Sequence, residues 1–120
     1  MDRTGLSVRT ELRDPVVVAT LSGDLDAATS AALERMGLDR ASRPVRLVIV
    51  LDELDILDSS GLGLLYRMWR RITGEGGRCA FVCTDKVVLR ILEIAGMLET
   101  LSVWSDVPDA VDHVTAAPDT

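Results

Sequence analysis

The run Val45–Leu51 constrains the fold more than any other stretch, because it is apolar except for Arg46. A strand with one solvated face alternates apolar and polar residues, and this run shows almost no alternation. It therefore predicts a central strand covered on both faces. Such a strand is typical of a sheet that carries helices on both sides.

Strand-like and helix-like segments alternate along the rest of the chain. Residues 6–12 alternate apolar and polar side chains, and Val16–Leu21 is an apolar strand that Ser22-Gly23-Asp24 should end. Further strands are expected at residues 78–83 and 101–104. Apolar residues at helical spacing, together with capping residues and glycines, predict helices at residues 27–38, from Asp58 to the glycines at 74–77, at 84–95 and at 106–114.

This order of elements predicts an α/β fold with a mixed, largely parallel sheet of about four to five strands and about four helices. Periodicity alone does not give the strand order. We expect a single domain over residues 1–120, with its core in residues 6–114 and a frayed tail at 115–120.

Charge and composition narrow the class of partner. The net charge of −6 opposes binding to nucleic acid or to an anionic membrane. No apolar run approaches the roughly 20 residues of a membrane-spanning helix, and the N-terminus lacks a secretory signal, so we expect a cytoplasmic protein without membrane insertion. Cys79 and Cys83 are read as buried thiols, and neither a metal site nor a cofactor is expected.

The segment from Asp55 to Leu65 stands out from a merely structural sequence. Asp58 is a good N-cap, whose carboxylate can accept from the backbone N–H of Ser60 or Gly61, and Ser59 then begins the helix. Gly61 and Gly63 each cost the helix up to about 1 kcal/mol relative to Ala. Small residues at these positions therefore need a compensating reason, such as close approach by another surface.

This segment has three alternative interpretations. Plain helix capping with tight packing of the helix on the sheet accounts for the same residues. A catalytic Ser59 is disfavoured, because the segment is not a Gly-x-Ser-x-Gly elbow and only His113 could act as its base. A Walker-type phosphate loop is disfavoured too, because the sequence lacks its Gly-Lys-Ser/Thr ending.

The motif Asp58-Ser59-Ser60-Gly61-Leu62-Gly63 resembles the signature of bacterial anti-sigma factor antagonists of the STAS family. Two weaker elements agree with it. Ser22-Gly23-Asp24-Leu25-Asp26 is similar to the family's Gly-Glu/Asp-Leu-Asp element, and Ala95-Gly96-Met97-Leu98 to its Gly-Leu turn. The resemblance covers about residues 6–114 and implies a single STAS-type domain.

The resemblance also implies partner switching that regulates transcription through a sigma factor. The unphosphorylated antagonist binds an anti-sigma factor that is also a serine kinase, and so releases the sigma factor. Phosphorylation of Ser59, with Ser60 as second choice, ends that complex, and a separate serine phosphatase reverses it. The chain is then a substrate and not an enzyme, since the kinase holds the ATP. The implied partner-binding residues are Asp24, Asp26, Asp58, Ser60, Gly61, Leu62 and Gly63.

The main alternative is a STAS subunit that is a permanent component of a transport, lipid-trafficking or stress-sensing complex. The sequence does not decide between a monomer and a weak dimer. The acidic run Asp52–Asp55 is interpreted as a solvated loop and His113 as a surface residue. A solvated helix face is likewise the expectation for Arg67, Arg70 and Arg71, whereas Trp69 and Trp104 are expected to pack in the domain.

Overall fold

The computed structural model describes residues 5–40 and 43–116. Its sheet has five strands in the order β1-β2-β3-β4-β5. The strands are β1 (Leu6–Arg13), β2 (Val16–Leu25), β3 (Arg46–Leu57), β4 (Arg78–Val82) and β5 (Val103–Trp104). Only β1 and β2 pair antiparallel, and the other neighbours are parallel. The predicted α/β fold with a largely parallel sheet is confirmed.

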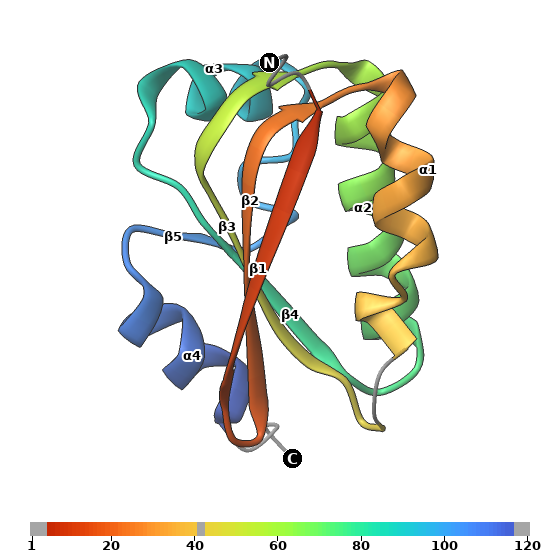
Figure 1. The fold of residues 1–120 in the computed structure, drawn as a ribbon. Coiled ribbons are helices and arrows are strands. Elements are labelled where there is room, and N and C mark those ends of the chain that lie inside the picture. Colours follow the sequence, from red (N-terminus) through yellow and green to blue (C-terminus); the bar gives the residue numbers. More distant parts are fainter. Residues whose placement is uncertain (1–4, 41–42, 117–120) are drawn as a thin grey trace.

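Helices cover both faces of this sheet. They are α1 (Ala27–Arg35), α2 (Ser59–Gly74), α3 (Lys86–Ile94) and α4 (Val107–Thr115), with a short 3-10 helix η1 at Leu38–Arg40. Figure 1 shows α1 and α2 side by side on one face, and α4 on the other. No helix within the described residues is both long and apolar enough to cross a membrane.

The strand β3 anchors two cores, as its apolar sequence predicts. Leu47, Ile49 and Leu51 belong to the larger core, which also contains Leu65 and Met68 of α2. Val48 belongs to the smaller core, with Ala110 and Val114 of α4. Because alternate residues of a strand point to opposite faces, one apolar strand holds both layers together.

Two strands are longer than expected. Ser22-Gly23-Asp24 does not end β2, and Asp52–Asp55 is not a loop, because the two segments pair with each other as β2 and β3 continue. Register shifts in β2 accommodate this irregular stretch. Glu53 accepts hydrogen bonds from Ser22 Oγ at 2.7 Å and from Arg9 Nη2 at 3.0 Å, so a charged residue is accommodated within the sheet.

The first helix is shorter than predicted, ending at Arg35 instead of residue 38. Gly37 has a φ of +69°, which an α-helix cannot continue through. The chain then forms η1, where buried Asp39 pairs with Arg71 of α2. Arg71 is therefore not part of a freely solvated arginine face. Most of the predicted tail, residues 117–120, lies outside the described residues.

The N-cap of α3 is Asp85, so this helix begins two residues later than the predicted residue 84. The Thr84 backbone N–H and hydroxyl both donate to the Asp52 carboxylate, at 2.6 and 3.2 Å. Asp85 Oδ1 instead accepts from the backbone N–H groups of Val87 and Val88, at 2.9 and 3.1 Å. Asp52 thereby ties the β4–α3 connection to β3.

The two glycines of the α2 motif have different surroundings. A Cβ atom at Gly61 would lie 2.6 Å from the Leu25 carbonyl oxygen and 2.7 Å from Leu25 Cγ. A Cβ atom at Gly63 would meet only the end of the Arg67 side chain, at 3.4 Å. Gly61 is therefore required by contact of α2 with β2, whereas the packing of the domain does not require Gly63.

Alanine substitutions at these glycines should change stability in opposite directions. Gly61→Ala should lower the free energy of unfolding by about 1–3 kcal/mol, because the backbone must move to admit the methyl group. Gly63→Ala should raise it by about 0.5–1 kcal/mol, because Ala favours the helix. Urea unfolding of both variants beside the unsubstituted protein checks this. Equal effects at the two positions would contradict the packing difference.

His113 is half-buried and hydrogen-bonded, unlike the surface residue that we expected. Its Nε2 lies 3.2 Å from Ser102 Oγ, which accepts the Trp104 indole N–H at 3.2 Å. The Ser102 hydroxyl can therefore donate to a neutral imidazole. Burial, with a smaller contribution from the charge of Arg78, lowers the pKa of His113 from its usual 6.5.

The lowered His113 pKa predicts that acid destabilises the fold. Below pH 6.5, the single histidine is protonated in the unfolded chain but still largely neutral in the folded chain. The free energy of unfolding should therefore decrease as the pH is lowered. His113→Gln should remove this part of the pH dependence. Urea unfolding of both proteins above and below this pH provides the measurement, and the same slope in both would show that His113 does not contribute.

Candidate functional site

Three parallel strands end at one edge of the sheet, and a helix begins after each of them. The strands β2, β3 and β4 lead into α1, α2 and α3, whose N-caps are Asp26, Asp58 and Asp85. This edge is at the top of Figure 1. Parallel strands with short connections bring helix N-termini together in this way, and ligands and partners often bind at such an edge. The Asp-Ser-Ser-Gly motif lies here.

The ends of β2 and α2 are joined by a backbone hydrogen bond. The Asp58 N–H donates to the Leu25 carbonyl oxygen at 3.2 Å, next to the place where Gly61 contacts Leu25. The register also pairs Asp24 with Ile56 and Leu25 with Leu57. The two motif segments that were quoted for the family resemblance are therefore neighbours in space.

Asp58 begins α2 as predicted. Its Oδ1 accepts the Gly61 N–H at 3.0 Å, and its carbonyl accepts the Leu62 N–H at 2.9 Å. Ser59 and Ser60 follow in the first turn, and both are exposed. Within the described residues neither hydroxyl makes a hydrogen bond, so both are accessible to another protein.

Asp24 and Asp26 lie beside this turn with different roles. The Asp26 carboxylate caps α1, accepting from the N–H groups of Ala28 and Thr29 at 3.0 and 3.1 Å. The Thr29 hydroxyl donates to the Asp24 carbonyl oxygen at 2.7 Å, which fixes the backbone there. The half-buried Asp24 side chain makes no hydrogen bond in the described part of the chain. Asp26 thus has a structural function whatever else it contacts.

The remaining motif residues differ in accessibility. Gly61 and Leu62 are buried, and Leu62 belongs to the larger core. Gly63 is half-buried, and a Cβ atom there would contact only the end of the Arg67 side chain, with Nη1 at 3.4 Å. Direct contact with a partner is therefore open to Ser59, Ser60, Asp24, Asp58 and Gly63 in this conformation. Any effect of Gly61 or Leu62 would act through the fold.

Two exposed apolar side chains near this edge were missed by the sequence analysis. Ile56, in the last residues of β3, is 48% exposed, and Val87, in the first turn of α3, is 69% exposed. The signal was present in the sequence, because only one residue of the Val87-Val88 pair can face the core, and Val88 does so. Exposed apolar groups beside polar ones are typical of protein interfaces.

Carboxylates dominate the electrostatics of this edge. The ends of the strands carry Asp24, Asp26, Asp58 and Asp85, and the exposed Asp55 adds a further negative charge.

Among the residues that the structure describes, no cluster of His, Cys, Asp and Glu side chains could hold a metal ion. Cys79 and Cys83 are free thiols, and burial raises the pKa of Cys83 to about 11. Thiolate chemistry at this cysteine is thereby suppressed.

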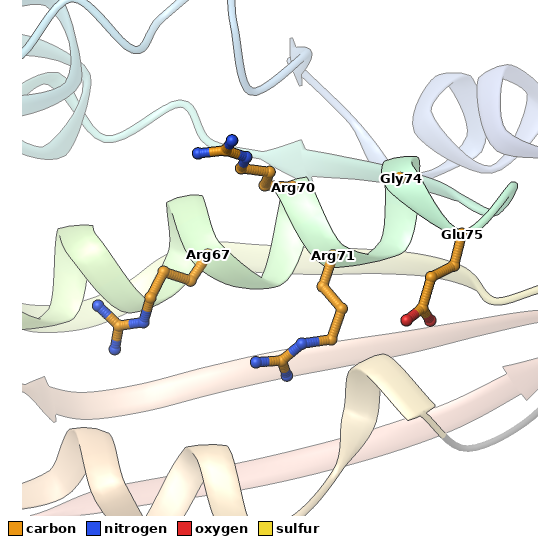
Figure 2. Close-up of a pocket in the computed structure, with 5 residues that line it drawn as sticks. All are labelled: Arg67, Arg70, Arg71, Gly74 and Glu75. Atoms are coloured by element: carbon orange, nitrogen blue, oxygen red, sulfur yellow. The ribbon is translucent and has the colours of Figure 1, made fainter.

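Three arginines lie along α2, beyond its first turns. Arg67, Arg70 and Arg71 line a surface hollow together with Gly74 and Glu75 (Figure 2). Arg67 and Arg71 extend to one side of the helix and Arg70 to the other. Arg71 is paired with Asp39 and lies 3.9 Å from Glu34. The hollow therefore does not present three unpaired arginines that could bind an anion together, because Arg71 is already paired.

A catalytic pairing of Ser59 with His113 is not formed. His113 lines a different hollow, which it shares with Thr73 and Gly77. Thr73 lies near the opposite end of α2 from Ser59, and α2 is about 1.5 Å long for every residue. The only histidine in the sequence therefore cannot activate Ser59.

Comparison with known proteins agrees with the fold and with the motif. The STAS domain model matches residues 7–110. The chain is 29% identical to an anti-sigma F factor antagonist of Paenibacillus polymyxa, over 91% of this chain and 95% of the relative. It is 32% identical to the anti-sigma-F factor antagonist RsfB of Mycobacterium tuberculosis, over 82% of this chain and 81% of the relative.

A solved structure extends the agreement to three dimensions. The crystal structure of an anti-sigma factor antagonist from Mycobacterium paratuberculosis has a TM-score of 0.82 and 26% identity. It covers 92% of this chain, which in turn covers 95% of that chain. The order of elements, the motif at the strand-to-helix junction and the matched residues lead to the same assignment, and the chain belongs to the STAS domain family.

Proposed function

We propose that this chain is an anti-sigma factor antagonist whose binding is controlled by phosphorylation of Ser59. Unphosphorylated, it binds an anti-sigma factor that is a serine kinase, and the sigma factor is released. The chain itself is a substrate and a binding protein, not an enzyme. Since sigma factors work with RNA polymerase, this function implies a cytoplasmic protein that acts without binding nucleic acid or inserting into a membrane.

One observation carries this proposal: the exposed hydroxyl of Ser59 at the start of α2, directly after the capping Asp58. A kinase must reach the acceptor oxygen and its surrounding backbone. Ser60 is also exposed, but it lies one residue further into the helix and remains the second choice. The names of the curated relatives support the same function.

The binding surface that we propose surrounds Ser59. Ile56 and Val87 supply exposed apolar contacts, and the missing side chain at Gly63, where only the end of Arg67 lies nearby, lets a partner approach the helix backbone. Asp24 and Asp58 supply negative charge, so a basic partner face is favoured. Asp26, Ser60, Gly61 and Leu62 belong to the same proposed surface, where Asp26, Gly61 and Leu62 act mainly by holding its shape.

Phosphorylation would change this surface without unfolding it. In the kinase, Ser59 Oγ attacks the γ-phosphorus of ATP, ADP leaves, and the hydroxyl proton passes to a base of the kinase. The product carries roughly −1.5 to −2 more charge at a helix N-terminus, where negative charge is stabilising for the fold. A partner surface that fits Asp24 and Asp58 is then opposed by added bulk and charge. A serine phosphatase restores the binding form.

Substituting each serine in turn should show which of the two accepts the phosphate. With the cognate kinase and ATP, Ser59→Ala should gain no phosphate and should still bind the kinase, whereas Ser60→Ala should gain one phosphate. Ser59→Asp should bind at least about tenfold more weakly, a loss of about 1.4 kcal/mol. Intact-mass spectrometry measures the phosphate, and isothermal titration calorimetry with ADP measures the affinity.

Three results would overturn this function. Phosphorylation of Ser59→Ala to the same extent as the unsubstituted protein would move the acceptor elsewhere. Capture of the same transport or scaffold proteins by the unsubstituted protein and by Ser59→Asp, without an anti-sigma kinase, would favour a permanent STAS subunit. Hydrolysis of ester substrates that Ser59→Ala abolishes would favour an enzyme.

A further inference from the structure

Ser59, Gly63 and Arg67 follow one another at intervals of four along α2. Residues four apart lie on neighbouring turns of a helix, and Cβ atoms point back toward its N-terminus. Arg67 therefore extends from its own turn toward the turn that contains Ser59. Figure 2 shows Arg67 on a different side of α2 from Arg70.

The Arg67 guanidinium lies over Gly63. A Cβ atom at Gly63 would be 3.4 Å from Arg67 Nη1, so the missing side chain leaves space that the guanidinium borders. Within the described residues Arg67 makes no hydrogen bond or ion pair, whereas Arg71, one turn further along, is paired with Asp39. Arg67 is thus a cation whose donors are available.

Ser59 and Arg67 are eight residues apart, a rise of about 12 Å along α2, and the Arg67 guanidinium spans part of it by lying over Gly63. The Cβ atoms of residues four apart are about 5–6 Å from one another, which is the separation between Ser59 and the space at Gly63. A phosphate on Ser59 extends part of that distance, and arginine is well suited to binding phosphate oxygens. No side chain at residue 63 stands between the two groups.

We propose that Arg67 binds the phosphate on Ser59, with the phosphate lying along α2 toward the Arg67 guanidinium over Gly63. This inference rests on the proposed phosphorylation of Ser59 and specifies how the modified state is held. The phosphate then occupies the space through which a partner reaches the helix at Gly63. Arg67 also offsets the repulsion between the phosphate and the neighbouring Asp58 carboxylate.

The experiment uses full-length protein with phosphoserine incorporated at residue 59 during synthesis, so that no kinase is needed. The second pKa of the phosphate is measured by ³¹P NMR in this protein and in its Arg67→Gln and Arg70→Gln variants. Arg70→Gln is a matched control, because it removes the same charge from an exposed position on the same helix. Circular dichroism establishes that all three proteins are folded.

Arg67→Gln should raise the pKa of the phosphate by roughly half a unit or more, because the dianion loses its cation. Arg70→Gln should leave it nearly unchanged, and Arg67→Lys should restore part of the effect. Equal shifts in the two Gln variants, or none in either, would overturn the inference. Failure of the kinase to modify Ser59 would instead count against the proposed function, and this titration would still report on Arg67.

Discussion

The contact between Gly61 and the Leu25 carbonyl is the constraint on which the rest of the site depends. Leu25 ends β2, and its carbonyl accepts the N–H of Asp58 at the start of α2. A side chain at residue 61 would push this junction apart. Since Asp24 and Asp26 flank Leu25, and Ser59 follows Asp58, the contact brings two segments distant in sequence to one surface. The position of the Ser59 hydroxyl is thus a consequence of packing.

The interior was predictable from sequence because burial leaves a periodic signal. Val45–Leu51 identified the central strand, and Asp58 and Asp106 marked helix starts that the structure has. The extension of β3 through Asp52–Leu57 was not predictable by the same rule. Its acidic residues are accommodated by partners from other segments: Arg9 and Ser22 for Glu53, and the Thr84 backbone for Asp52. Local patterns do not contain such long-range pairings.

The site was predicted less completely than the fold, because a motif does not say which of its residues are accessible. From the sequence, both Gly61 and Gly63 could be small in order to admit a partner. In the structure, Gly61 is required by packing within the domain, and only Gly63 lies where a partner could approach it. Ile56 and Val87 were missed because apolar residues are assigned to the core by default. Arg67 was grouped with Arg70 and Arg71, although the three have different surroundings.

We propose that one phosphate on Ser59, at an exposed and fixed helix start, is enough to exclude a partner. The most direct measurement is the affinity of the anti-sigma kinase, with ADP bound, for protein carrying phosphoserine at residue 59 and for the unmodified protein. We predict at least about a hundredfold weaker binding of the phosphorylated form, about 3 kcal/mol, with an unchanged circular dichroism spectrum. Equal affinity of the two forms would contradict the account.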